Sequence, residues 1–146
     1  MTEDGSREEA ARVSRRRGWW YYTRDIVRNY PVLRERLREL RTPGTTGEGL
    51  GRSSEPGRST ERLALRDLPK AERRELEAVE RAIAVTRGLP DGKERLQVIR
   101  LVHWRMSHTM TGAAQTVHVS LSTAYRWQND FFVLVARLRG LVDKKP

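Results

Sequence analysis

Residues 111–127 read TGAAQTVHVSLSTAYRW, a stretch that has the features of two helices joined by a tight turn. We expect a short helix over 111–117, a turn at His118-Val119-Ser120 and a long helix over 121–139. Ser120 is a favoured N-cap type, because its hydroxyl accepts a hydrogen bond from an amide that has no partner within the helix. His118 falls where a left-handed backbone is convenient, and histidine tolerates that conformation better than most residues. The stretch therefore predicts a helix-turn-helix at 111–139.

The two helices of such a motif cross closely, so small and apolar side chains must lie between them. The residues that we assign to this inner side are Ala113, Ala114, Val117, Val119, Ala124 and Trp127. The residues that then project outward from the front half of the second helix are Leu121, Ser122, Tyr125, Arg126 and Asn129. In this geometry the front half of the second helix enters the major groove of DNA.

The outward side chains suit the edges of base pairs. Arg126 has the donors for guanine O6 and N7, Asn129 pairs with adenine, and Leu121 or Tyr125 offers an apolar contact to a thymine methyl group. Hydroxyls and amides at the helix starts suit phosphates, as do the charges of Arg and Lys. The DNA-binding residues that we predict are Thr111, Ser120, Leu121, Ser122, Thr123, Tyr125, Arg126, Asn129, Arg105, Lys144 and Lys145. The alternative is a helical hairpin that packs for structural reasons only.

The charge of the chain favours a polyanionic partner. The chain has 146 residues, a length typical of one domain, and its formal net charge is +10. Residues 93–146 hold nine basic and three acidic residues, residues 1–41 hold eleven and seven, and residues 42–92 hold nine of each. Positive charge at both ends suits double-stranded DNA, although RNA and anionic membranes also attract basic proteins.

Other classes of protein are disfavoured by composition. The chain has no cysteine, which excludes disulfides and thiolate zinc sites and fits a cytoplasmic protein. It has no apolar run of about 18 residues and no segment like a signal peptide, so we expect no membrane span. The predicted binding to DNA then implies a location at the nucleoid. His103, His108 and His118 are not spaced for one helix face, and no nucleophile stands beside a base. We therefore expect no metal, no cofactor and no catalytic activity.

The N-terminal part contains one more helical pattern. We expect residues 1–18 to be a flexible basic segment and residues 19–41 to be helical with a kink at Pro31. The apolar stripe of this helix consists of Trp19, Tyr22, Ile26, Tyr30, Leu33, Leu37 and Leu40. It fits either an ordinary core face or a coiled-coil contact with a second copy. The aromatic run at 19–22 fits helix packing, with stacking on single-stranded bases as the alternative.

The middle of the chain predicts a linker followed by a helical domain. Residues 42–59 hold five glycines and two prolines with almost no apolar residues, so we expect a flexible linker. Residues 60–146 then form a domain with a helix over 60–87 that Pro69 kinks or splits, a stop at 88–92 and a helix over 94–106. Residues 131–136 (FFVLVA) are apolar nearly all round, so they pack against the N-terminal helix or against a second subunit.

The stretch at 111–127 resembles region 4 of bacterial sigma factors, chiefly through Val119-Ser120, Ser122-Thr123 and Tyr125-Arg126. Together with FFVLVA, Gly140-Leu141 and Arg28-Asn29-Tyr30-Pro31, it resembles the RinA and ArpU type of phage late transcription regulators. The residues 59–61 and Trp104 also fit that pattern, which covers roughly residues 19–143. This chain departs from it at His118 and in the long glycine-rich linker.

The resemblance implies an all-α regulator of phage or prophage late genes that contacts RNA polymerase. Ser120, Ser122, Thr123, Tyr125 and Arg126 are the recognition-helix positions that it carries over. One rival is a DNA-packaging component of the small terminase type, which would bind DNA as a ring of subunits. A second rival is an adaptor like an anti-sigma factor, which would bind no duplex.

Overall fold

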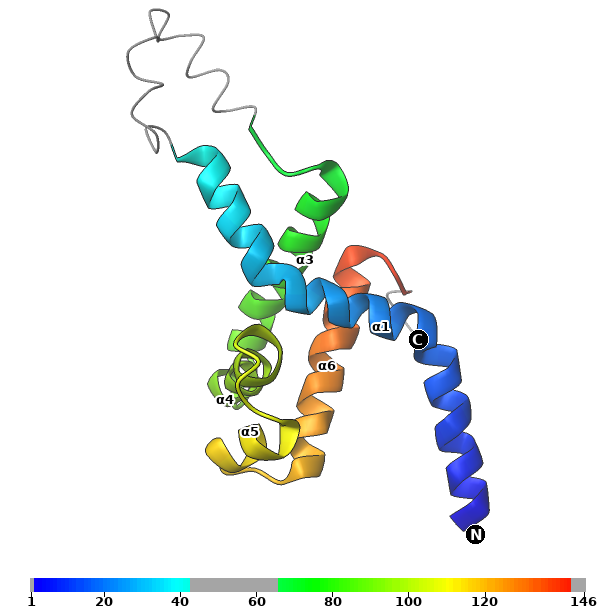
Figure 1. The fold of residues 1–146 in the computed structure, drawn as a ribbon. Helices are drawn as coiled ribbons and strands as arrows, with labels where there is room; N and C mark the ends of the chain where they lie inside the picture. Colours follow the sequence, from blue (N-terminus) through cyan, green and yellow to red (C-terminus); the bar gives the residue numbers. More distant parts are fainter. Residues whose placement is uncertain (1, 43–65, 143–146) are drawn as a thin grey trace, which may run out of the picture.

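The computed structural model describes residues 2–42 and 66–142, and of residues 2–17 only the backbone. Within this part of the chain the fold is all-α, as the sequence predicts, and has no strand. The elements are α1 (Thr2–Arg41), α3 (Lys70–Arg87), α4 (Gly92–Ile99), the π-helical turn η2 (Arg100–Trp104), α5 (Met110–Thr116) and α6 (Leu121–Arg139). Figure 1 shows α3 and α6 side by side, with α1 crossing both and α5 beside the start of α6.

The larger of two hydrophobic cores lies where α1, α3 and α6 meet. Its fully buried side chains include Val27 and Leu33 of α1, Leu76 and Val79 of α3, and Phe132 of α6. Burial of such side chains contributes about 1.5–3 kcal/mol each, so this three-helix contact is the main source of stability.

Most of the apolar surface for which the sequence left two alternatives is covered within one chain, although Tyr22 of the α1 stripe is exposed. Ile26, Tyr30 and Leu33 from the α1 stripe are buried in the core. So are Phe131 and Phe132 of α6, which pack against α1 and α3. The aromatic run at 19–22 divides: Trp20 packs against Phe132 with ring centroids 5.2 Å apart, while Tyr21 and Tyr22 stay exposed.

Helix α1 is longer than the segment over 19–41 that we predicted, and it passes through Pro31 without a break. It begins at Thr2, because residues 2–17 are rich in Glu, Arg and Ala, which are good helix formers. No fresh start occurs at the proline, although Figure 1 shows that α1 is not straight.

A contact from another helix explains how α1 accommodates its proline. Proline has no amide hydrogen, so the carbonyl four residues earlier, at Val27, loses its helical donor. The indole Nε1–H of Trp104 in η2 donates to that Val27 oxygen at 2.8 Å. The proline therefore creates an acceptor inside the helix, and Trp104 satisfies it while joining η2 to α1.

The connection between α3 and α4 is tight. Helix α3 begins directly after Pro69 and ends at Arg87, and α4 begins at Gly92, in agreement with the predicted stop at 88–92. Only glycine fits at position 92 without a steric clash, because a Cβ there would lie 2.3 Å from the Thr86 carbonyl oxygen. Residues 60–65 of the helix that we predicted over 60–87 lie outside the described part of the chain. The predicted linker over 42–59 also lies outside it, except for Thr42.

The helix that we expected over 94–106 ends earlier and changes type. Its second half is the π-helical turn, which ends at Trp104. Met106, the last residue of the expected helix, has a φ of +53° and is 62% exposed, so it lies outside the helix. The amides of Ser107 and His108 both donate to the Leu101 carbonyl, which turns the chain toward α5.

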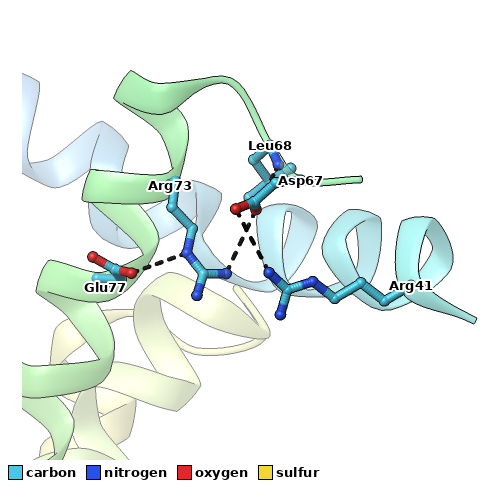
Figure 2. A network of polar contacts seen from close by, with 5 residues as sticks. All are labelled: Arg41, Asp67, Leu68, Arg73 and Glu77. Carbon is cyan, nitrogen blue, oxygen red and sulfur yellow. Dashed lines mark hydrogen bonds and ion pairs between the residues drawn. The ribbon is translucent and has the colours of Figure 1, made fainter. Parts of the chain in front are cut away.

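Ion pairs join the end of α1 to the start of α3, as Figure 2 shows. Asp67 lies 3.6 Å from Arg41 and 3.7 Å from Arg73, and its carboxylate accepts the Leu68 amide at 2.7 Å. Arg73 also pairs with Glu77 at 2.9 Å. Each such pair is partly exposed and contributes at most about 1 kcal/mol, so the network fixes orientation more than it adds stability.

Candidate nucleic-acid interface

Helices α5 and α6 are joined by four residues, 117–120, whose backbone follows the predicted turn. His118 has a φ of +63°, the left-handed conformation expected there. The Val119 amide donates to the Ala114 carbonyl at 3.0 Å. Ser120 caps α6, with its Oγ accepting the Thr123 amide at 3.1 Å. Thr109 caps α5 in the same way by accepting the Gly112 amide at 3.1 Å.

The inner side of this helix pair forms the second hydrophobic core. Ala113 and Ala124 are fully buried, and Trp127 is 4% exposed. Val98 and Leu101, from α4 and η2, close the core from the other side. The inward residues predicted from the sequence are therefore correct, with Val117 and Val119 packed at the edge. This packing holds α5 and the front half of α6 against the rest of the domain.

The outer side of α6 carries exposed side chains of mixed chemistry. Leu121 is 41% and Tyr125 47% exposed, and Ser122 and Arg126 also face solvent. These positions follow one another by one or three residues, so they share one face of the helix. The face opposite holds Ala124 and Trp127, which explains why the outward set is free.

The other predicted residues lie around this face in different environments. Thr111 and Arg105 are exposed, whereas Thr123 and Asn129 are partly buried. The Thr123 hydroxyl accepts a hydrogen bond from Ser120 Oγ at 2.9 Å, so both hydroxyls take part in the cap. Lys144 and Lys145 lie outside the described residues.

The stretch that runs from Arg95 in α4 through the front half of α6 carries charge of one sign. Residues 95–129 hold four arginines and no Asp or Glu. Asp130, the next carboxylate along the chain, pairs with Arg95 at 3.4 Å. Arg95 is held further by the Pro90 carbonyl at 3.1 Å and by the ring of Trp127, 5.6 Å from its guanidinium carbon. Arg126 has no such ion pair within the described part of the chain, so its donors face solvent.

A chain of hydrogen-bonded polar side chains joins α1, η2 and the inner face of α6. The sequence analysis did not predict it. Arg28 of α1 donates through Nε to His103 Nδ1 at 3.1 Å, which leaves the imidazole proton on Nε2. His103 Nε2 then lies 2.5 Å from Gln128 Oε1 in α6. One signal was visible in the sequence, because Gln128 shares the inward helix face with Ala124, Trp127 and Phe131.

Burial is the main reason why the pKa of His103 falls to about 4. The hydrogen bond with Gln128 acts in the opposite direction, and the charges of Arg28 and Arg24 lower the pKa further. The imidazole is therefore neutral at physiological pH and serves as a hydrogen-bonding link between α1 and α6.

The described residues contain neither a cluster suited to a metal ion nor a helix suited to a bilayer. No group of three or more His, Asp or Glu side chains in these residues is placed to hold a metal ion. None of the described helices has both the length and the apolar character needed to cross a bilayer.

Comparison of the chain with protein-family models, with curated proteins and with solved structures finds no match.

Proposed function

We propose that the protein is a sequence-specific DNA-binding regulator of phage or prophage late transcription. In this proposal α5 and α6 act as a helix-turn-helix, and the front half of α6 lies in the major groove. The observation that carries the proposal is the exposed outer face of α6, with Arg126 unpaired on it and with no carboxylate among residues 95–129.

Each exposed residue has a role in this arrangement. Arg126 forms the bidentate contact to guanine, and Leu121 and Tyr125 supply the apolar contacts to thymine methyl groups. Thr111 and Arg105 contact phosphates, because both are exposed near the start of α5. Asn129 is partly buried and acts at the end of the face, as a contact to adenine.

The class of regulator and its partner rest on the resemblance to the RinA and ArpU type and to sigma region 4. They imply that the protein acts at the nucleoid of a bacterial host, beside RNA polymerase. A packaging component of the small terminase type would use the same helix pair within a ring. Ile26, Tyr30 and Leu33 of the α1 stripe are buried within one chain, as are Phe131 and Phe132. This burial favours the regulator, because it leaves less apolar surface for a ring contact.

The test begins with selection of bound duplexes from fragmented genomic DNA, which gives a specific site. Arg126→Ala should then lower the affinity ratio between this site and random duplex by about 1–3 kcal/mol, or roughly 5- to 150-fold. The matched control is Arg81→Ala, which removes the same charge from an exposed position on α3 and should leave the ratio unchanged. Lys144→Ala should weaken binding to all duplexes about equally.

Two results would contradict the proposal. If Arg126→Ala weakened specific and random duplex alike, the groove assignment of α6 would be wrong. If the wild type bound no duplex even at low salt, the protein would not act on DNA. Sedimentation in solution separates regulator from packaging component, because a ring of many subunits would favour packaging.

A further inference from the structure

A second basic site lies away from the outer face of α6, in a cavity of about 360 Å³ between α1, the end of α3 and η2. Four arginines line it: Arg34 of α1, Arg87 at the last residue of α3, Arg100 at the start of η2, and Arg105 just after η2. No Asp or Glu is among its lining residues. None of the four guanidinium groups forms an ion pair with a carboxylate in the described part of the chain.

Aromatic side chains give the cavity a fixed wall. The rings of Tyr30 and Trp104 lie with centroids 5.4 Å apart, and the guanidinium carbon of Arg34 lies 6.0 Å from the Tyr30 centroid. Trp104 is held in place by its hydrogen bond to the α1 backbone. Glu80 of α3 influences Tyr30 electrostatically but does not line the cavity.

The four guanidinium groups are exposed, so solvent screens their mutual repulsion in part, and an anion between them would remove it. Planar guanidinium groups bind phosphate oxygens in bidentate fashion, which makes arginine clusters suited to phosphate ligands. The volume of the cavity falls in the range of sites for small ligands. A compact anion with several charges would fit such a site.

The shape of the site decides between a small ligand and a duplex. Each backbone phosphate of a duplex carries a single charge on a convex surface. A chain of linked phosphates carries several charges in a small volume and can enter a recess that four arginines surround. We propose that this arginine pocket binds a compact polyphosphate, of the pyrophosphate or nucleoside triphosphate class. Only Arg105 is shared with the predicted DNA contacts, so the proposal is largely separate from the proposed function.

Isothermal titration calorimetry of the full chain with inorganic triphosphate tests the proposal. The expected result is saturable binding at one ligand per chain, with sulfate at matched ionic strength giving none. Arg100→Gln and Arg87→Gln should each weaken binding about tenfold, because each removes charge-assisted hydrogen bonds. Arg126→Gln, which removes a charge from the outer face of α6, should leave binding unchanged. Unaltered circular dichroism melting verifies that each variant folds.

A titration with a nucleoside triphosphate distinguishes the source of the phosphates. Tighter binding than that of inorganic triphosphate would indicate that the nucleoside also contacts the aromatic wall.

Three outcomes would overturn the proposal: no saturable binding of triphosphate, equal weakening by Arg126→Gln, or loss of duplex affinity in Arg100→Gln without any triphosphate binding. The last would assign the pocket to the DNA interface instead. Triphosphate binding without duplex binding would refute the proposed function and leave the pocket intact.

Discussion

Protonation of His103 should destabilise the fold in mildly acidic solution. The imidazole is 3% exposed and is surrounded by Arg28 on α1, Gln128 on α6 and the ring of Phe132 at 5.1 Å. Burial lowers its pKa from the ordinary 6.5 to about 4, so the neutral form is the one that the fold accommodates. The unfolded chain therefore takes up this proton first as the pH falls.

The direction and size of the effect follow from proton linkage. The contribution of His103 is fully present above the unfolded pKa of 6.5 and is lost as the pH falls from 6.5 toward the folded value of about 4. With these two pKa values the loss is about 2 kcal/mol at pH 5 and about 3 kcal/mol at pH 4. Since small domains have stabilities of about 5–15 kcal/mol, such a loss is measurable.

Urea unfolding followed by circular dichroism at pH 7.5, 6 and 5 measures this loss. His103→Gln is the comparison, because glutamine keeps polar atoms at the position but does not titrate. The carboxylates titrate in both proteins and cancel in the difference. The wild type should lose about 2 kcal/mol more than His103→Gln between pH 7.5 and pH 5. Equal losses would refute the reasoning, because they would mean that His103 binds its proton equally well in the folded and unfolded states.

Three further substitutions test local features of the fold by urea unfolding. Trp104→Phe should lower the free energy of unfolding by about 1–3 kcal/mol, because it leaves the buried Val27 carbonyl unpaired. The loss should be smaller in a Pro31→Ala background, where the amide of residue 31 is restored. Equal losses in the two backgrounds would exclude the pairing of Trp104 with this carbonyl. Ser120→Ala should cost about 1 kcal/mol through loss of the α6 cap, and an unchanged stability would contradict the cap. Gly92→Ala should lower the free energy of unfolding by about 1–3 kcal/mol, because the added Cβ would lie 2.3 Å from the Thr86 carbonyl oxygen. Gly88→Ala is the control and should lower it less, because a Cβ there has its nearest atom at 3.6 Å.

Much of the helix pair was predictable because its determinants are local. The bounds of α6, the cap at Ser120 and the left-handed His118 depend on neighbouring residues and on helix periodicity, both visible in the sequence. The inward alanines and Trp127 follow from the same periodicity. The end of α4 at Ile99, within the helix that we expected over 94–106, was not predicted. Residues 100–106 contain no glycine or proline that would mark it.

The sequence by itself determined the all-α class, the inner and outer faces of α6 and the positive charge around them, since these depend on spacing and composition. Only the tertiary structure decided that the centre of the α1 stripe is buried within one chain, that Trp104 meets the carbonyl that Pro31 leaves unpaired, and that Arg34, Arg87, Arg100 and Arg105 line one cavity. The physical reason is that each of these depends on a partner tens of residues away, and the choice of partner is made by the packing of helices rather than by any local pattern.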